Sequence, residues 1–477
     1  MSSLRSASST SSCWGRQAMS FLWCGASIQQ TKLKKNSTTP ETTIGSQSAS
    51  RSVAILRVSI GGRARPPREH TASSGIGDDR VCCQGSGASF VPPSPSPCPA
   101  GSSALTVPAN PLTMDTVQRK QPSEFAAEII HGSARALVSA SVERMFAKDP
   151  SLPVRWGSGA FQKWVSELHA RVDQLISAAR LHRPAVFVAN TDWARRAYAA
   201  RNVEEKDLAL GLMCLGEVLE EELPAPAADA LRPYFKGALA HFGTPLEDEP
   251  SPLDRCGEHT DLAVRYLTRL LEGKREVASG LILDAVASGV PVDRIYLQVL
   301  GPVQDELGRL WLAGEVHVGE EHYCTASTMH VMSQLYPVIA AAPKRDGRTV
   351  LAASVEGNAH EIGIRMVSDF FELAGWRSIY LGTSIPADDL VQTMIDFEVD
   401  VVCLSAMLTV HLDVVGDTIN AVRAEPRTAD IPVIVGGKAF MLDPDIWKDL
   451  GADGSERHPV DTVDLAEKLV TAGRPKV

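Results

Sequence analysis

The sequence predicts an α plus α/β protein, in which an N-terminal helical bundle and a second, four-helix bundle precede a flavodoxin-like, doubly wound parallel sheet. Three observations predict this fold class. Apolar residues recur at the three-and-four spacing of helices between residues 123 and 242 and again between 259 and 339. From residue 347 onward, short apolar runs alternate with helical patterns, which is typical of a parallel sheet. Residues 1–113 show no sustained period.

The first 113 residues also differ from the rest in composition. They hold eleven Lys and Arg against four Asp and Glu, and stretches such as Phe90–Ser103 consist largely of Ser, Pro and Gly. Such a composition cannot bury enough apolar surface to offset the entropy cost of ordering the chain. We therefore expect residues 1–113 to be disordered, or to follow from a start codon assigned too far upstream, with the folded sequence beginning at Met114.

Charge, hydropathy and cysteine spacing exclude several classes of protein. The 477 residues carry 47 Lys and Arg against 57 Asp and Glu, which argues against nucleic-acid binding as the main function. No apolar run approaches the roughly 20 residues of a membrane span. No CxxC pair indicates a zinc site or a disulfide framework. We expect a cytoplasmic protein without a membrane contact.

Breaks in the pattern divide the chain into domains. We predict a helical module of unknown role over residues 114–243, an acidic linker over 244–256, a four-helix bundle over 257–342 and an α/β domain over 347–477. In the module, a helix follows Ser123, and apolar spacing predicts further helices at Phe161–Leu181, Asp207–Glu222 and Ala227–Phe242.

The same reasoning gives the later elements. The predicted helices of the four-helix bundle are Thr260–Leu271, Arg275–Ala287, Val292–Leu312 and Val318–Ile339. The predicted strands of the α/β domain are Thr349–Val355, Ser378–Leu381, Val401–Leu404 and Ile431–Val435, with a shorter one near Gly451–Ser455. The predicted helices of that domain are Ile364–Ala374, Asp388–Phe397, Leu412–Ala424 and Thr462–Thr471.

The most informative stretch is the loop after the first strand. It carries His360, and in an open α/β sheet ligands bind outside the carboxyl ends of the strands. Taken alone, a histidine there is a loop residue or a helix cap. Asn358, His360 and Gly363, however, have a spacing that resembles the cobalamin-binding motif Asp-x-His-x-x-Gly, with Asn in place of Asp.

Three later segments extend this resemblance over residues 347–477. Ser405-Ala406-Met407 ends a predicted strand as the family's Ser-x-Leu/Met does, Gly436-Gly437 matches its Gly-Gly turn, and Gly451–Gly454 matches the end of its next segment. The resemblance implies that His360 is the lower ligand of cobalt, that Ser405 reaches the buried base and that Gly436 and Gly437 let the nucleotide tail pass. The cofactor-binding set that we infer from it is Asn358, His360, Gly363, Ser405, Met407, Thr409, Gly436 and Gly437.

The departure at Asn358 has a chemical consequence. An Asp at this position accepts the second N–H of the ligand histidine and raises its basicity. An amide oxygen accepts the same bond without a charge, so we expect His360 to be a weaker donor to the metal.

A second motif lies in the four-helix bundle. On the residues alone, Trp311 ends an apolar stripe and Glu321 is an acid at a helix N-terminus. Trp311, nine further residues and then Glu321-His322 resemble the Trp-x9-Glu-His motif of cobalamin photoreceptors of the CarH and AerR type. The resemblance implies that Trp311, Glu321 and His322 form an upper pocket around an adenosyl group. Leu312 stands where DNA-binding members place a His, so His317, His322, His330 or water would take the upper cobalt position after photolysis.

These motifs predict a regulatory protein that holds adenosylcobalamin, responds to light by losing the adenosyl group, and is not an enzyme. A corrinoid carrier that holds methylcobalamin for a methyltransferase is the alternative. A radical mutase is disfavoured, because it would need a (β/α)₈ barrel of roughly 250 residues. We expect a protein partner or self-association through the helical domains, and no segment resembles the winged-helix DNA-binding domain of CarH-type proteins.

Overall fold

The computed structural model describes residues 121–246, 249–343 and 347–472. The expectations for residues 1–113 therefore lie outside the described part of the chain. Within the described residues, no helix is both long and apolar enough to cross a membrane.

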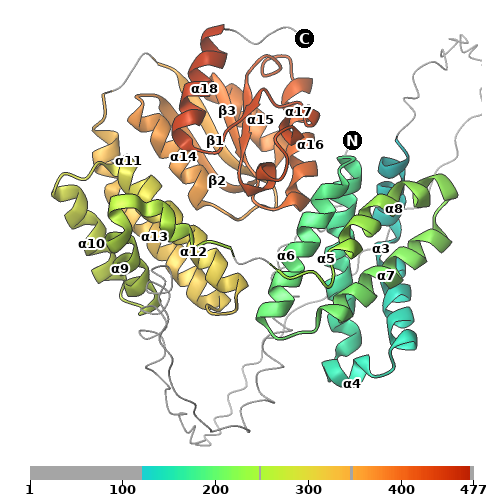
Figure 1. The fold of residues 1–477 in the computed structure, drawn as a ribbon. Helices are drawn as coiled ribbons and strands as arrows, with labels where there is room; N and C mark the ends of the chain where they lie inside the picture. The colour runs from blue at the N-terminus through green and yellow to red at the C-terminus, as the bar shows by residue number, and fades with distance from the viewer. Residues whose placement is uncertain (1–120, 247–248, 344–346, 473–477) are drawn as a thin grey trace, which may run out of the picture. The chain divides into compact units, whose positions relative to one another are not determined.

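The helical module is built from six helices (Figure 1). They are α3 (Pro122–Lys148), α4 (Leu152–Trp156), α5 (Ala160–Arg180), α6 (Pro184–Ala200), α7 (Glu205–Glu222) and α8 (Ala225–Ala240). The predicted helices correspond to α3, α5, α7 and α8. Helix α6 is absent from the sequence prediction because Asn190, Thr191 and Asp192 interrupt its apolar pattern, and such residues favour turns and caps. It begins at Pro184, and proline is a favoured residue at the first position of a helix.

The second bundle is preceded by the 3₁₀ segment η1 (Pro252–His259) and contains α9 (Thr260–Leu271), α10 (Arg275–Ala287), α11 (Val292–Ile295), η2 (Tyr296–Leu300), α12 (Gly301–Leu312) and α13 (Val318–Ala340). The sequence predicts one helix over Val292–Leu312, but η2 is a π-helical turn inside it. Pro302, the second residue after this turn, has no N–H to donate, which is a common cause of a local change in helical winding.

The α/β domain contains one parallel sheet with the strand order β2-β1-β3-β4-β5. Its strands are β1 (Thr349–Val355), β2 (Arg377–Ile385), β3 (Val401–Ser405), β4 (Val433–Gly436) and β5 (Gly454–Ser455). Its longer helices are α14 (Ile362–Leu373), α15 (Ala387–Asp396), α16 (Leu412–Ala424) and α18 (Pro459–Ala472), with the short α17 (Ile446–Asp449) and the 3₁₀ turns η3 (Thr409–His411) and η4 (Lys438–Met441). The predicted flavodoxin-like fold is confirmed. The largest differences in the strand boundaries are that β2 extends to Ile385 and that β4 begins at Val433 rather than Ile431.

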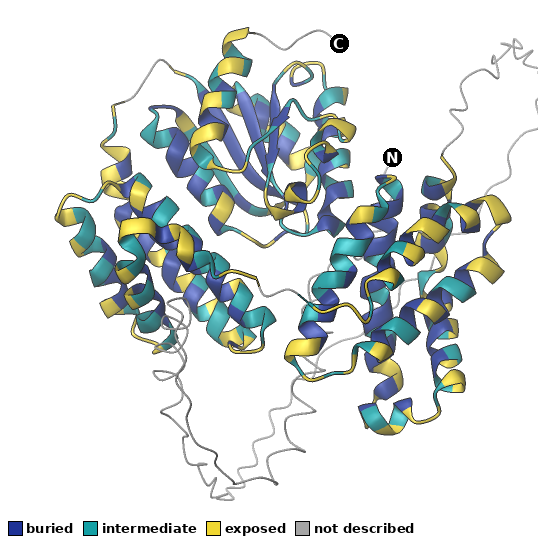
Figure 2. Cartoon of the chain, viewed as in Figure 1, coloured by how far each residue is buried: buried dark blue, intermediate teal, exposed yellow. Residues whose placement is uncertain are grey.

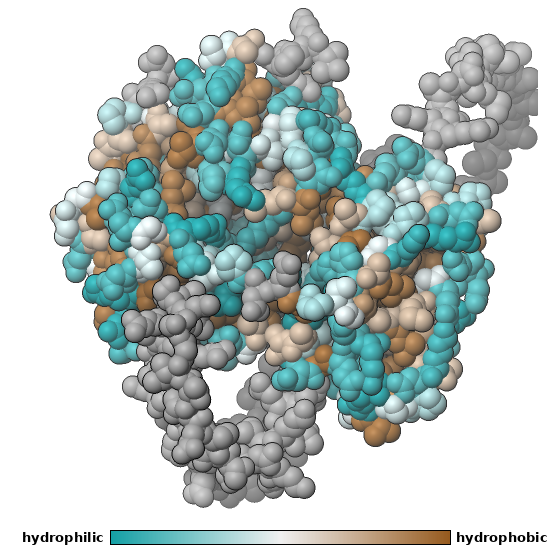
Figure 3. Space-filling view, in the orientation of Figure 1, coloured by the Kyte–Doolittle hydropathy of each residue, from teal (hydrophilic) through white to brown (hydrophobic). Residues whose placement is uncertain are grey.

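The central strands β1, β3 and β4 are buried on both faces, as Figure 2 shows by their dark colour, whereas the edge strand β2 is mostly half-buried. Alternate residues of β1 belong to different cores: Leu351 and Ala353 pack with the helical module and α16, whereas Val350 and Ala352 pack with the second bundle, α14 and α18. Strand residues point alternately to opposite faces, so a sheet covered on both sides reads as a continuous apolar run. Outside these cores, Figure 3 shows polar and apolar residues intermixed on the surface drawn.

Candidate functional site

The candidate site lies at the carboxyl end of the sheet, where three loops meet. Ser354 at the end of β1 pairs with Ser405 at the end of β3, and Ser405 pairs with Gly436 at the end of β4. This register brings together the loop after β1 with His360, the loop after β3 with Thr409, and the turn at Gly437. The predicted residues that follow β1, β3 and β4 thus lie together at one edge of the sheet, as expected for a parallel sheet. We call this part the lower half of the candidate site.

Asn358 holds His360 in a defined orientation. Asn358 is completely buried, and its amide nitrogen donates to the Ser405 carbonyl at 3.0 Å and to the Ser354 hydroxyl at 3.3 Å. The amide oxygen therefore faces the other way, where it lies 3.0 Å from Nδ1 of His360. Because a carbonyl oxygen only accepts, Nδ1 carries the proton and Nε2 keeps a lone pair. That is the tautomer a metal ligand needs.

The surroundings of His360 keep its ring neutral. The residue has an exposed surface, but desolvation by the neighbouring loops, together with His411 and Lys438, lowers its pKa to about 4. A neutral imidazole is the form that binds metals, so little proton loss would accompany ligation near pH 7. Glu356 is exposed, and it does not supply the negative charge that Asn358 lacks.

His411 is a candidate site residue that the sequence analysis does not identify. It ends η3 with 6% of its surface exposed, and its Nδ1 has no hydrogen-bond partner among the described residues. A Cβ built on Gly357 would lie 3.8 Å from its Nε2, which places the ring beside the loop of His360. Burial lowers its pKa to about 4. A buried nitrogen without a partner is costly, and a polar group of a bound ligand would satisfy it.

Gly437 allows two loops to touch. Its φ is +102°, and a Cβ there would lie 2.2 Å from the Ala406 carbonyl oxygen, in the loop after β3. Only glycine fits such a backbone approach. Gly436 is less restricted, with a Cβ 3.3 Å from the Glu456 carbonyl oxygen. Gly363 has open space beside it, so the packing of the chain itself does not require a glycine there.

Three predicted residues line the end of β3. Ser405 uses its backbone carbonyl to orient Asn358, and Met407 is half-buried beyond it. Thr409 is buried and is engaged by the helical module: its hydroxyl bonds with the Asn190 side chain at 2.8 Å, and its carbonyl accepts from the Ser177 hydroxyl at 2.7 Å.

The predicted upper residues lie on α12 and α13. Trp311, half-buried in the last turn of α12, stacks against Trp193 of α6. Glu321 accepts from the Thr325 hydroxyl at 2.8 Å and lies 2.6 Å from Nδ1 of His322, whose side chain is 72% exposed. The contacts therefore join Glu321 to His322, and Trp311 to the helical module.

An ion pair joins α12 to the lower half of the site. Lys438, directly after Gly437, lies 2.9 Å from the carboxylate of Asp305 on α12. The pair connects the second bundle to the Gly-Gly turn. Asp305 precedes Trp311 on the same helix, α12. The sequence offered no signal for Lys438, because a single lysine after a turn is usually a solvated side chain.

The donor set suits a metal that arrives inside a macrocycle. Among the described residues, no group of three or more His, Cys, Asp or Glu side chains is arranged to hold a metal ion. A single oriented imidazole supplies one axial ligand, and a macrocycle supplies the others. The lone pair of His360, the unsatisfied Nδ1 of His411 and the glycine-lined turn at Gly437 all fit such a ligand with a polar tail.

Comparisons with known proteins agree with this chemistry. Residues 348–464 match a family model described as a B12 binding domain, and residues 262–336 match a second B12 binding domain model. A corrinoid protein of Desulfitobacterium hafniense is 25% identical over 206 residues, which cover 42% of this chain and 94% of that protein. The HTH-type transcriptional repressor CarH of Myxococcus xanthus is 30% identical over 159 residues, which cover 33% of this chain and about half of the repressor (52%).

Further similarities are of the same kind. Dimethylamine corrinoid protein 3 of Methanosarcina acetivorans is 23% identical over 193 residues, covering 40% of this chain and 89% of that protein. Among solved structures, the monomethylamine corrinoid protein of Methanosarcina barkeri aligns with a TM-score of 0.40 and 19% identity, covering 44% of this chain and 99% of that one. The sequence matches support binding of a cobalamin or related corrinoid, and they include a repressor as well as corrinoid proteins.

Proposed function

We propose that the protein is a regulatory sensor that binds adenosylcobalamin and responds to light by loss of the adenosyl group. The observation that carries cobalamin binding is the orientation of His360, whose Nε2 lone pair is set by the bond from Nδ1 to Asn358. The observation that favours a sensor is the presence of Trp311 and Glu321 at the spacing of the photoreceptor motif. Adenosylcobalamin supplies a cobalt–carbon bond that light breaks.

In this proposal His360 is the lower axial ligand. Asn358 holds the imidazole by a neutral hydrogen bond, which raises its basicity less than a carboxylate would. Ser405, Met407, Thr409, Gly436 and Gly437, together with His411, would surround the nucleotide tail. Gly363, with open space beside it, would allow the corrin edge to approach α14.

The upper pocket would be formed by Trp311, Glu321 and His322. A flat indole packs well against a purine, and a carboxylate accepts hydrogen bonds from ribose hydroxyls. Among the histidines that could replace the adenosyl group, His317 is already engaged as the N-cap of α13: its Nδ1 accepts from the Glu320 amide at 3.1 Å. This leaves His322, His330 or water for the upper position.

The second candidate is a corrinoid methyl carrier that holds methylcobalamin for a methyltransferase. The corrinoid proteins among the relatives favour it. A methyl group, however, needs no clamp of Trp311 and Glu321, and a carrier must expose the cobalt to its partner enzyme. The helical module is also additional to what a carrier needs. We therefore place the sensor first, with a protein partner or self-association as its output.

One experiment separates the two candidates. The full chain is loaded with adenosylcobalamin in the dark, and visible spectra are recorded before and after green light. A sensor shows tight binding and a light-dependent spectral change, and Trp311→Ala weakens adenosylcobalamin more than methylcobalamin. A carrier instead passes the methyl group of methylcobalamin to a supplied methyltransferase system.

Two variants test the ligand assignment in the same assay. His360→Ala removes the proposed lower ligand and should change the dark spectrum and lower the affinity for either cobalamin. His131→Ala, an exposed histidine on α3 of the helical module, is the matched control and should bind as the unaltered chain does. An unchanged dark spectrum in His360→Ala would contradict the ligand assignment.

A further inference from the structure

The helical module touches both halves of the proposed cofactor site. In the upper half, the ring of Trp193 on α6 stacks on that of Trp311 with centroids 6.1 Å apart and an interplanar angle of 27°. In the lower half, Ser177 and Asn190 bond to Thr409.

Arg201 binds the end of α12. Its guanidinium donates to the carbonyls of Leu312 at 3.0 Å and Trp311 at 3.3 Å, and lies 5.8 Å from the centre of the Trp311 ring. These carbonyls belong to the last turn of α12, where helical carbonyls lack a partner within the helix. A cation at this point also complements the helix dipole. Trp193 and Arg201 together restrict where the Trp311 indole can lie.

The module is held to the sheet domain beside Thr409 by charge pairs. Arg180 lies 2.8 Å from the carboxylate of Asp413 in the first turn of α16. Arg183, at the start of α6, donates to Asp443 and to Asp449. Helix α6 is thus anchored near the sheet at one end and contacts α12 at the other, with Asn190 between them.

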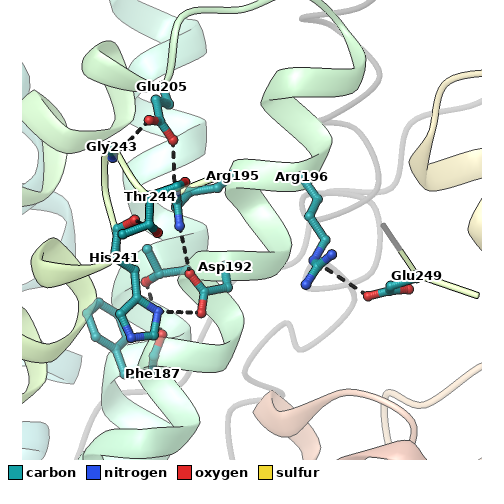
Figure 4. A network of polar contacts seen from close by, with 10 residues as sticks. Phe187, Asp192, Arg195, Arg196, Glu205, His241, Gly243, Thr244 and Glu249 are labelled. Atoms are coloured by element: carbon teal, nitrogen blue, oxygen red, sulfur yellow. Dashed lines mark hydrogen bonds and ion pairs between the residues drawn. The ribbon is translucent and has the colours of Figure 1, made fainter. Parts of the chain in front are cut away.

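Polar contacts also connect α6 to the rest of the module (Figure 4). The buried Arg195 bonds to Glu205 at 2.9 Å and to the Thr244 carbonyl at 2.9 Å, and Asp192 lies 2.7 Å from His241. Arg196 lies 3.5 Å from Glu249, in the segment that leads to the second bundle. A shift of α6 would therefore be passed to α7, α8 and this connecting segment.

We propose that Trp193 and Arg201 are positioning residues for Trp311, through which the helical module senses the upper group of a bound cobalamin. The inference rests on the proposed function and assigns a role to the module. An upper group that packs against Trp311 favours one position of the indole. The position of the indole in turn determines how well its ring stacks on Trp193 and lies beside Arg201. By thermodynamic linkage, the upper group and the docking of α6 then stabilise or weaken each other equally.

The test compares two cobalamins that differ in the upper group. Affinities of the full chain for adenosylcobalamin and for cyanocobalamin, whose upper ligand is small, are measured in the dark by spectral titration. Trp193→Ala should lower the preference for adenosylcobalamin by about two- to tenfold, the size expected for one aromatic pair, and leave cyanocobalamin binding unchanged. Trp193→Phe keeps an aromatic ring and should retain most of the preference.

The matched control removes an aromatic contact elsewhere in the module. Phe161→Ala loses the edge-to-face contact with Phe146, whose ring centre is 6.0 Å away, and should leave the preference unchanged. Circular dichroism confirms that each variant is folded. Hydrogen exchange of the full chain provides a second readout: protection of α6 amides should differ between the two cobalamins, whereas protection of α3 amides should not.

The outcomes separate this inference from the proposed function. If the unaltered chain binds neither cobalamin, both are overturned. If it binds both but Trp193→Ala weakens them equally or not at all, or if exchange in α6 is the same with either, the module has only a structural role and the inference alone fails.

Discussion

At the scale of single residues, the site is defined by a buried amide. Asn358 spends its two N–H groups on Ser405 and Ser354, so only its oxygen is left for His360. The fixed amide sets the tautomer of the imidazole without adding a charge to the buried loop. Burial of a lone carboxylate there would be costly, and Lys438, a cation that acts on the His360 ring, is already paired with Asp305.

His411 leads to a prediction about acid stability. Burial lowers its pKa to about 4, so the folded chain resists protonation while the unfolded chain accepts a proton near pH 6.5. Below pH 6.5, protonation of His411 therefore stabilises the unfolded chain more than the folded one. The free energy of unfolding is unaffected by this residue above pH 6.5 and falls as the pH drops toward 4. A fall in the pKa from 6.5 to about 4 corresponds to a loss of roughly 3 kcal/mol in the free energy of unfolding once the pH is well below 4.

Urea unfolding without cobalamin at pH 7.5, 6 and 5 tests this prediction. His411→Phe keeps an aromatic ring but cannot be protonated, so it should lose less stability between pH 7.5 and 5 than the unaltered chain. Part of the pH dependence remains, because the pKa of His360 is lowered as well. His330→Phe changes an exposed ring and serves as the control. Equal pH slopes in His411→Phe and the unaltered chain would contradict the assignment.

Residues differ in how far the sequence alone reveals them. His360 is predicted as a site residue by the resemblance of Asn358, His360 and Gly363 to the cobalamin-binding motif, and the structure places its ring at the carboxyl end of the sheet. His411 could not be predicted, because a lone histidine after a strand has no pattern to separate it from a core residue. The partners of Trp311 were equally hidden, since Trp193 is more than a hundred positions away in the sequence.

At the scale of elements, periodicity was sufficient for most of the fold. The strands and the amphipathic helices are where their apolar patterns place them. The failures have local causes: polar residues inside α6 mask its pattern, and the π turn before Pro302 interrupts a stripe that looks continuous. The strand boundaries shift because hydrogen bonding between strands, which a single segment does not encode, decides where each one ends.

Two glycines at element ends should behave differently when changed to alanine. In Gly437→Ala the new Cβ would lie 2.2 Å from the Ala406 carbonyl, at a φ of +102°, so the turn must move. We expect a loss of about 2 kcal/mol or more in the free energy of unfolding, with weaker cobalamin binding. In Gly363→Ala the Cβ meets nothing within 4 Å, and stability should stay the same or rise by up to about 1 kcal/mol.

Urea unfolding and cobalamin titration of both variants test these expectations. Gly363→Ala is the more informative variant for the site. A stable Gly363→Ala chain that no longer binds cobalamin would show that the open space beside α14 is used by the cofactor, whereas undiminished binding would remove Gly363 from the proposed site. An equally stable Gly437→Ala chain would contradict the account of the turn.

At the scale of the whole described chain, the sheet domain is shared between two hydrophobic cores. The core that contains Leu351 and Leu404 also contains residues of α3, α5, α7 and α8, so the helical module and the sheet bury apolar surface together. Sequence patterns predicted each helix separately but gave no partner for its apolar face. A shared core is expected to make the module and the sheet unfold in one cooperative transition.

Reversing one charge tests this cooperativity. Arg183 is half-buried and bonds to both Asp443 and Asp449, so Arg183→Glu removes two ion pairs and places three acids together. Arg232→Glu is the matched control, because Arg232 also faces two acids, Glu220 and Asp229, but all three lie within the module and are exposed. We expect Arg183→Glu to weaken docking by about 1–3 kcal/mol, whereas Arg232→Glu should cost less than about 1 kcal/mol. In calorimetry of the full chain, Arg183→Glu should split or broaden the transition and Arg232→Glu should leave it single; a single, unshifted transition in Arg183→Glu would show that the module folds with the sheet independently of this contact.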